Sequence, residues 1–346
     1  MGLARQPLPQ QDSVNRIIVA GARGFFGSSV VRILRAEGYA PLAASRRPGG
    51  AVRFDVEDSA SIRSVIRPRD VIVDATAAFQ TRTATLVEEA IAIGADVVDL
   101  CDSLSYARLI STRDKAARHR GVRLLNACSS VSVLSAFAIE RSGIRDPIAL
   151  HGFLAPATRR TASRGVAESL LATVGRTITV RRDGGLRDVQ GWMETHYFPA
   201  LQRRGWLTEM ADAFTLPRAY PSLQNVDFWV DPNTRGAGAL LQIVSRMPAL
   251  SPIAVRLARY GIAFARILGS DEGMLAYEIE STAGGQSTVV FTGRESYLMA
   301  AIPAALAAVR LASGDLCPAG VVPVHQHLDM NDLAAALSRH GIGVTF

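Results

Sequence analysis

The sequence predicts an α/β protein in which a doubly wound parallel sheet is followed by a second, α+β domain built on a mostly antiparallel sheet. In the first half, short apolar runs rich in β-branched residues alternate with helical stretches that end at glycine, an order typical of parallel sheets. In the second half, apolar and polar residues alternate, as in strands with one exposed face. The 346 residues are enough for two separate cores.

The strands of the first half are expected at buried apolar runs, which are residues 15–20, 40–44, 52–54, 70–75, 96–100 and 122–127. Glycine stops the helices between them because it adopts the left-handed conformation without strain. These helices are expected from Gly27 to residue 37, at 81–93 and at 104–120, followed by Gly38, Gly94 and Gly121.

The second half is expected to contain five strands, at residues 148–155, 178–182, 226–230, 274–279 and 287–291. Residues 283–285 (Ala-Gly-Gly) predict a hairpin between the last two strands. Helices are expected at 165–174, 237–268, 295–312 and 329–340. The chain then divides into a loose tail (1–14), a first domain (15–138), a second domain with the substrate pocket (139–294), and C-terminal helices that return to the first domain (295–346).

Three glycines between the first strand and the first helix form a GxxGxxG pattern: Gly21, Gly24 and Gly27. A diphosphate can sit at a helix N-terminus only where the backbone comes close and free N–H groups face it. Gly21 permits the tight turn, Gly24 the close approach, and Gly27 the packing of helix on strand. We predict a Rossmann-type dinucleotide site here. The other residues expected in this site are Phe25, Phe26, Ala75 and Thr76. The alternative is a tight turn that binds no ligand.

The end of the second strand selects the cofactor. Enzymes that use NAD place an acid there for the ribose hydroxyls, but this chain has three other residues, Ser45, Arg46 and Arg47, with Arg23 in the glycine loop nearby. Guanidinium groups bind a 2′-phosphate by charge-assisted hydrogen bonds, so we predict NADP(H), the alternative being plain surface arginines. Two acids follow the next strand and are expected near the adenine edge, Asp55 and Asp58, the latter equally suited to cap a helix.

These motifs resemble the saccharopine dehydrogenase-like family of NADP-dependent oxidoreductases. Beside the glycine loop, the matching stretches are residues 75–79, 93–100, 121–128, 132–133, 163–169, 320–323 and 337–342. The resemblance implies a Rossmann domain, a substrate domain, and C-terminal helices that pack on the Rossmann domain. Members of the family act on varied substrates, including lipid-like ones. The chain departs from the family after Cys128, where a glycine, a proline and two acids are replaced by Ser129, Val131, Leu134 and Ala136.

Ligands of open parallel sheets lie beyond the carboxyl ends of the strands, where this chain has loops at 76–80, 101–106 and 128–132. A hydride reaction needs a proton donor or acceptor near the reacting carbon. The titratable candidates there are Asp99, Asp102, Tyr106 and Cys128. Alternatively, Asp99 caps or braces the loop, Asp102 caps the following helix, and Cys128 is a buried packing residue. His151 is a fifth candidate if its face of the strand lines the cleft, and otherwise a hydrogen-bonded core histidine.

Composition excludes several function classes. Lys115 is the only lysine, and no tyrosine has a lysine four residues later, which excludes the short-chain dehydrogenase mechanism. The net charge of +7 comes from scattered arginines without interleaved aromatic residues, so no nucleic-acid partner is expected. Three widely spaced cysteines, Cys101, Cys128 and Cys317, form no metal pattern, so no metal is expected and a reducing cytoplasm fits.

The sequence therefore predicts a cytoplasmic, NADP(H)-dependent oxidoreductase that transfers hydride to or from a small or lipid-like substrate. A catalytically silent NADP-binding sensor or regulatory protein is one alternative, and an acylating semialdehyde dehydrogenase with Cys128 as nucleophile is another. Residues 247–268 combine apolar residues with arginines and fit a buried amphipathic helix better than one on a membrane surface. A homodimer is left open.

Overall fold

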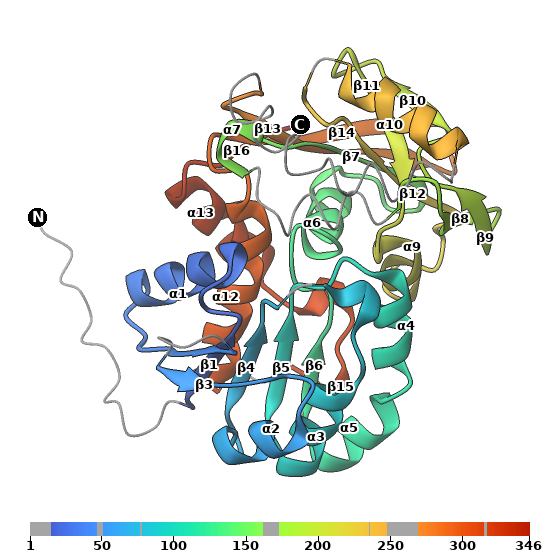
Figure 1. The fold of residues 1–346 in the computed structure, drawn as a ribbon. Coiled ribbons are helices and arrows are strands. Elements are labelled where there is room, and N and C mark those ends of the chain that lie inside the picture. The colour runs from blue at the N-terminus through green and yellow to red at the C-terminus, as the bar shows by residue number, and fades with distance from the viewer. Residues whose placement is uncertain are drawn as a thin grey trace, which may run out of the picture.

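Two sheets lie one above the other, with helix α6 (Val133–Arg141) between them (Figure 1). The computed structural model describes residues 15–46, 51–76, 78–161, 173–234, 236–247, 269–314 and 317–346. The first sheet is parallel throughout, and the second is mixed and mostly antiparallel. The expected fold class is confirmed.

The first sheet has the strand order β15-β6-β5-β4-β1-β2-β3. Its strands are β1 (Ile17–Ala20), β2 (Leu42–Ser45), β3 (Val52–Arg53), β4 (Val71–Asp74), β5 (Asp96–Asp99), β6 (Arg123–Leu125) and β15 (Gly320–Val321). The chain adds β2 and β3 on one side of β1, and β4 to β6 on the other, so the strand order reverses between β1 and β4. Ligands of doubly wound sheets bind at such a reversal.

Helices cover both faces of the first sheet, because successive residues of a strand point to opposite faces. Ile17 and Val19 of β1 belong to the apolar cluster of α1 and α12, whereas Ile18 and Ala20 belong to the cluster of α2 to α5. The bounds of these helices are α1 (Phe25–Ala36), α2 (Ser59–Val65), α3 (Thr85–Ile93), α4 (Leu104–Ser111), α5 (Asp114–Arg120) and α12 (Leu298–Ala312).

The helix expected at 104–120 is two helices, α4 and α5. The break follows Ser111 and Thr112, whose hydroxyls donate to the carbonyl oxygens of Arg108 and Leu109 at 2.7 Å. Such side-chain bonds compete with the backbone ladder of a helix. Gly121 ends α5 with φ +69°, as expected for a glycine stop.

The second sheet centres on β7, which pairs with β12 in parallel and with β13 antiparallel. Its strands are β7 (Pro147–Ala155), β8 (Thr177–Arg182), β9 (Gly185–Gln190), β10 (Thr195–Phe198), β11 (Arg203–Thr208), β12 (Asn225–Val230), β13 (Gly273–Ser281), β14 (Gln286–Gly293) and β16 (Gly343–Thr345). The expected helix at 237–268 begins as α10 (Ala237–Arg246), and its part from 248 onward lies outside the described residues, as does most of 165–174.

The C-terminal part of the chain contributes to both sheets. Helix α12 packs against α1, β1, β4 and β5, and β15 pairs with β6 as an edge strand of the first sheet. After α13 (Met330–Arg339), β16 pairs with β14 of the second sheet. One apolar cluster joins the sheets, running from Val19 through Phe137 of α6 to Tyr277 of β13.

Candidate functional site

The turn between β1 and α1 packs its three glycines tightly at the carboxyl edge of the first sheet. Gly21 has φ +76°, and a Cβ there would lie 2.7 Å from the carbonyl oxygen of Ala75, just after β4. A Cβ on Gly27 would lie 2.6 Å from the carbonyl carbon of Gly21 and closer still to its oxygen. The amide of Gly24 donates to that same oxygen at 2.7 Å. Backbone therefore fills the places where side chains would stand at positions 21 and 27.

Helix α1 begins at this turn without an acidic residue in its first turn and without a side-chain cap at Gly24. The amides of Phe25, Phe26 and Gly27 have no carbonyl one turn earlier in the helix to bond. These N–H groups and the helix dipole favour an anion. The exposed Arg23 stands beside them in the loop.

The end of β2 lies next to the glycine loop, because the amide of Ala22 donates to the carbonyl oxygen of Ala44 at 3.1 Å. Ser45 is buried, Arg46 after it is exposed, and Arg47 lies outside the described residues. Beyond β3, two acids shape the turn before α2: Asp55 accepts from the amide of Glu57, and Asp58 caps α2 through the amide of Ala60. The cap expected as one role of Asp58 is present.

An ion-pair network that the sequence did not indicate fixes Thr76. Asp74, fully buried at the end of β4, accepts from the amide and the hydroxyl of Thr76 at 3.0 and 2.5 Å. Arg82 donates to the second oxygen of Asp74 at 2.8 Å, bonds the hydroxyl of Thr76, and pairs with Glu57 at 2.5 Å. Only 5% of the Arg82 side chain is exposed. The network thus holds the loops after β3 and β4 together beside the glycine turn.

Asp99 joins the ends of β5 and β6. Its carboxylate accepts from the side chain of Asn126 at 2.7 Å and from the amides of Ala127 and Cys101 at 2.8 and 3.0 Å. Burial raises the pKa of Asp99 to about 6, although these hydrogen bonds oppose the shift. Asp99 is only 2% exposed, and all of these hydrogen bonds come from groups of the first sheet and its loops. Its geometry is therefore that of a residue that fixes the loops after β5 and β6.

Asp102 stands on the loop after β5 and is partly exposed. Gln80, from the loop after β4, donates to its carboxylate at 3.2 Å. The cap of α4 is Ser103, which accepts from the amide of Tyr106, so the N-cap alternative for Asp102 is wrong. Glu209, just after β11, faces this loop from the second domain: burial, and also the charge of Asp102, raise the pKa of Glu209. Glu209 was not predicted, because the strand that precedes it, β11, was not expected from the sequence.

Tyr106 and Cys128 are buried. The ring of Tyr106 packs on Phe79 with centroids 5.2 Å apart, and burial raises the pKa of its phenol. Cys128 has no exposed surface, and burial raises the pKa of its thiol well above the usual value. A thiol in this state is protonated at neutral pH and is a poor nucleophile.

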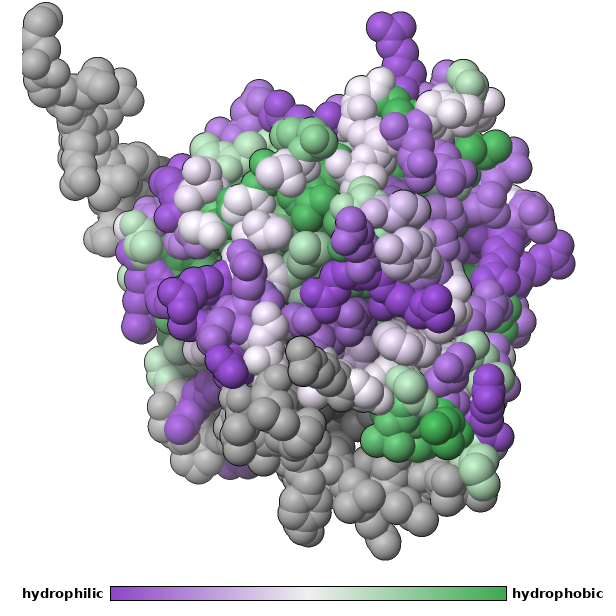
Figure 2. Space-filling model, turned by 90° about the horizontal axis from the view of Figure 1, so that it is seen from above, coloured by the Kyte–Doolittle hydropathy of each residue, from purple (hydrophilic) through white to green (hydrophobic). Residues whose placement is uncertain are grey.

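His151 lies on the face of the second sheet that is turned away from the first. Tyr277 of β13 belongs to the apolar cluster that joins the sheets, so the alternating residue Glu278, which is opposite His151 in register, points outward with it. Figure 2 looks down on this outer face, where polar and apolar side chains are mixed. The condition for a catalytic His151, a face that lines the cleft, is not met.

The hydrogen bonds of His151 fit the other alternative. Its Nδ1 lies 2.7 Å from Asp227 Oδ1, and its ring stacks on His196 of β10 with centroids 5.3 Å apart. Burial opposes protonation, but the hydrogen bond and charge of Asp227, with the charges of Glu280 and Glu278, outweigh it and raise the pKa of His151. The histidine is part of a polar cluster that ties β10 to the sheet.

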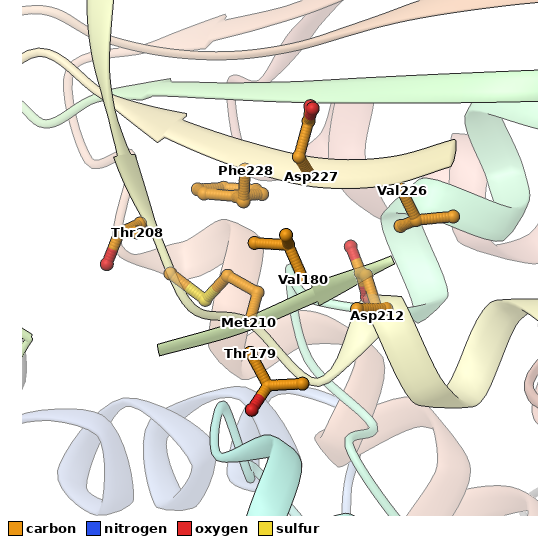
Figure 3. A pocket seen from close by; sticks show the side chains of 9 residues that line it. Thr179, Val180, Thr208, Met210, Asp212, Val226, Asp227 and Phe228 are labelled. Atoms are coloured by element: carbon orange, nitrogen blue, oxygen red, sulfur yellow. The ribbon is translucent and has the colours of Figure 1, made fainter. Parts of the chain in front are cut away.

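A narrow cavity lies between β8, β12 and α9 (Asp212–Thr215), with the side chains of Val180, Asp212 and Val226 around it (Figure 3). It is too narrow to hold a water molecule, so it is no ligand site. Among the described residues, no group of three or more His, Cys, Asp or Glu side chains is arranged to hold a metal ion. None of the helices that the structure describes has the length and apolar composition needed to cross a bilayer.

The carboxyl edge of the first sheet therefore brings together the glycine turn, Thr76 and Asp102, as the sequence predicted for those loops. It does not bring His151 there, and Asp99, Tyr106 and Cys128 lie below the surface. Arg82 and Glu209 belong to this edge but were not expected. An arginine eight residues beyond a strand-ending aspartate is the one signal that could have indicated the network around Thr76.

Comparison with known proteins agrees with this geometry. Residues 17–145 match the model of the NAD dependent epimerase/dehydratase family, a range that holds every strand of the first sheet except β15 but is less than half of the chain. No match was found among curated protein sequences.

Two solved structures illustrate the likeness. Apo saccharopine dehydrogenase (L-Glu forming) from Saccharomyces cerevisiae is similar with a TM-score of 0.59 and 14% identity, over 96% of this chain and 99% of the yeast chain. The WlbA (WbpB) dehydrogenase from Thermus thermophilus, solved with NAD and α-ketoglutarate, has a TM-score of 0.41 and 13% identity, over 94% of both chains. The chain thus has the two-domain fold of saccharopine dehydrogenase, and the resemblance seen in the motifs is confirmed at the level of the fold.

Proposed function

We propose that this chain is an oxidoreductase that binds NADP(H) at the glycine turn and transfers hydride to or from a small or lipid-like substrate. One observation carries the proposal: backbone occupies the Cβ positions of Gly21 and Gly27, so the uncapped start of α1 lies open to a diphosphate at the point where the strand order reverses. The fold shared with saccharopine dehydrogenase supports it.

The preference for NADP over NAD rests on charge. No carboxylate stands at the described end of β2, where Ser45 is followed by the exposed Arg46. A guanidinium there would contribute about 1.5–3 kcal/mol per hydrogen bond to a 2′-phosphate, which corresponds to a preference of about tenfold to a hundredfold.

Asp102 is the proton carrier we propose for the reaction. Of the five candidates, it alone is both partly exposed and at the carboxyl edge. A second carboxyl group is near: the amide of Ala211, two residues beyond Glu209, donates to the carbonyl oxygen of Asp102 at 3.0 Å. Burial, and to a lesser degree the charge of Asp102, raise the pKa of Glu209.

Calorimetry with NADP⁺ and NAD⁺ tests the cofactor assignment. We expect NADP⁺ to bind at least about tenfold more tightly, and Arg46→Asp to remove that preference. The control is Arg108→Asp, which makes the same charge change at an exposed position on α4, away from β2. No heat from either dinucleotide, or an unchanged preference in Arg46→Asp, would refute the assignment.

Turnover separates the alternatives. NADPH oxidation with aldehyde, imine or enoyl compounds supports the oxidoreductase, and Asp102→Asn should lower kcat by about 10²-fold or more without changing the NADP⁺ dissociation constant. Tight binding without turnover of any such compound favours the silent sensor instead. The buried, protonated state of Cys128 does not favour the acylating alternative.

A further inference from the structure

The loop between β6 and α6 contains a strained turn at Ser132. This residue has φ +67° and ψ −53°, and across it the amide of Val133 donates to the carbonyl oxygen of Val131 at 2.9 Å. The result is a γ-turn with positive φ, which is rare and strained for a residue with a Cβ. Such a turn persists only where its surroundings hold it.

Side chains of the second domain hold this turn. Asp212, at the start of α9, accepts from the hydroxyl of Ser132 at 2.8 Å and, with its other oxygen, from the hydroxyl of Ser135 at 2.6 Å. Thr215 Oγ1 lies 2.6 Å from Ser132 Oγ. On the other side of the loop, Tyr277 of β13 donates to the carbonyl oxygen of Ser130 at 2.8 Å.

The carboxylate of Asp212 is buried, and among the residues that the structure describes no cation forms an ion pair with it. Its residue is 1% exposed, and the serines that bond it, Ser132 and Ser135, are 0% exposed. Val226 and Phe228 line the narrow cavity on its other side (Figure 3). The carboxylate accepts from these two hydroxyls and from the backbone N–H of Ser132. A buried carboxylate held by such bonds is costly compared with an apolar side chain, so stability alone is a weak reason for its place in the core.

The same helix start also holds the loop of Asp102. The amide of Ala211 donates to the carbonyl oxygen of Asp102 at 3.0 Å, and Ala211 packs in a small apolar cluster with Ala107, Ala127 and Val131. One short segment of the second domain, residues 211–215, therefore contacts the loops after both β5 and β6.

We propose that Asp212 is a positioning residue, which holds the γ-turn at Ser132 and thereby sets the shape of the 128–132 loop at the carboxyl edge of the first sheet, where we expect the substrate. This role rests on the proposed oxidoreductase function. The hydrogen bonds of its carboxylate go to Ser132 in the β6 loop and Ser135 in α6, so we expect its loss to change this loop rather than the dinucleotide turn.

Three variants test the proposal: Asp212→Asn, Ser132→Gly and, as a control, Asp332→Asn on an exposed position of α13. Asp212→Asn should lower kcat/KM by about tenfold to a hundredfold, with the NADP⁺ dissociation constant within about twofold of the wild type. Ser132→Gly removes the strain of the positive φ but also the hydroxyl that donates to the buried Asp212, so it should lose a similar part of kcat/KM and melt at the wild-type temperature or below. Asp332→Asn should leave all three quantities unchanged.

Two results would overturn the proposal. One is a wild-type kcat/KM in Asp212→Asn. The other is an equal loss of cofactor affinity and turnover, since a residue that only maintains the fold would affect both cofactor binding and turnover. Amide hydrogen exchange gives a readout that needs no turnover: in Asp212→Asn, exchange at 130–133 should rise by about tenfold while that at 21–27 stays unchanged. If the wild type turns over no compound, the proposed function fails, and unchanged exchange at 130–133 would show that Asp212 does not hold the loop.

Discussion

Replacing Gly27 by alanine measures how tightly the glycine turn is packed. Helix propensity alone would make alanine in the first turn of α1 more stable by about 1 kcal/mol. The structure predicts the opposite sign, because the new Cβ would lie 2.6 Å from the carbonyl carbon of Gly21 and 3.0 Å from the Cα of Ala22. Both are backbone atoms that cannot rotate away. To reach an ordinary carbon–carbon distance of about 3.5–4 Å, helix and turn must separate by about 1 Å.

This separation moves the first amides of α1 away from the diphosphate. Overpacking of this kind costs about 1–3 kcal/mol, and each 1.4 kcal/mol that falls on the bound state weakens binding about tenfold. We therefore expect Gly27→Ala to raise the NADP⁺ dissociation constant by about tenfold to a hundredfold, and to lower the melting temperature by several degrees. Titration calorimetry and thermal unfolding measure the two effects.

The matched control is Gly185→Ala on β9, where the nearest atom to the added Cβ is the carbonyl oxygen of Arg182 at 3.9 Å. This variant adds the same methyl group to open space, so it should bind NADP⁺ as the wild type does. Gly27→Ala that binds within about twofold of the wild type and melts no lower would refute the packing argument and remove the main support for the dinucleotide site.

Three further predictions concern buried groups. Arg82→Met leaves Asp74 buried without its cation, and we expect the free energy of unfolding in urea to fall by about 3–5 kcal/mol; a loss below about 1 kcal/mol, the value of a surface pair, would contradict the network. Burial lowers the pKa of His327 to about 4, so the unfolded chain takes up that proton first as the pH falls. The contribution of His327 to the free energy of unfolding is therefore lost between about pH 6.5 and 4, by up to about 3 kcal/mol. His327→Gln should flatten that part of the plot of unfolding free energy against pH. Parallel plots for the variant and the wild type would contradict the prediction. Cys128, buried with a raised pKa, should resist thiol reagents in the native protein with activity intact; rapid labelling with loss of NADPH oxidation would favour the acylating chemistry instead.

Except for the edge strand β15, the first sheet could be predicted from the sequence, most clearly where its strands are buried on both faces. The run at 70–75, for example, became β4 (Val71–Asp74), in which every residue is buried. The strands β9 and β10 were not expected, because they are short and mostly exposed and carry little apolar alternation. A local pattern also shows that His151 and Leu150 lie on opposite faces, but it does not show which face meets the first sheet.

In the candidate site, too, some residues could be predicted from the sequence and others could not. The glycine turn could be found because its three glycines lie within one short stretch, residues 21–27, and their spacing reflects one local packing problem. The pairs that fix the neighbouring loops join residues far apart: Asp212 lies 80 residues from Ser132, and Arg82 lies 8 from Asp74. The first pair has no local signature, and the only sign of the second is the spacing of an arginine eight residues beyond a strand-ending aspartate, a weak one because both residue types occur throughout the chain.

The edge strand β15 has a consequence for how the protein is made. It pairs with β6 through Gly320 opposite Arg123, so nearly two hundred residues of chain separate these neighbours. A ribosome that has released the first domain's other six strands still holds both this strand and the helix α12 that covers one face of the sheet. During that interval the nascent sheet exposes an apolar face and an unpaired edge at β6, the features that promote aggregation and attract chaperones.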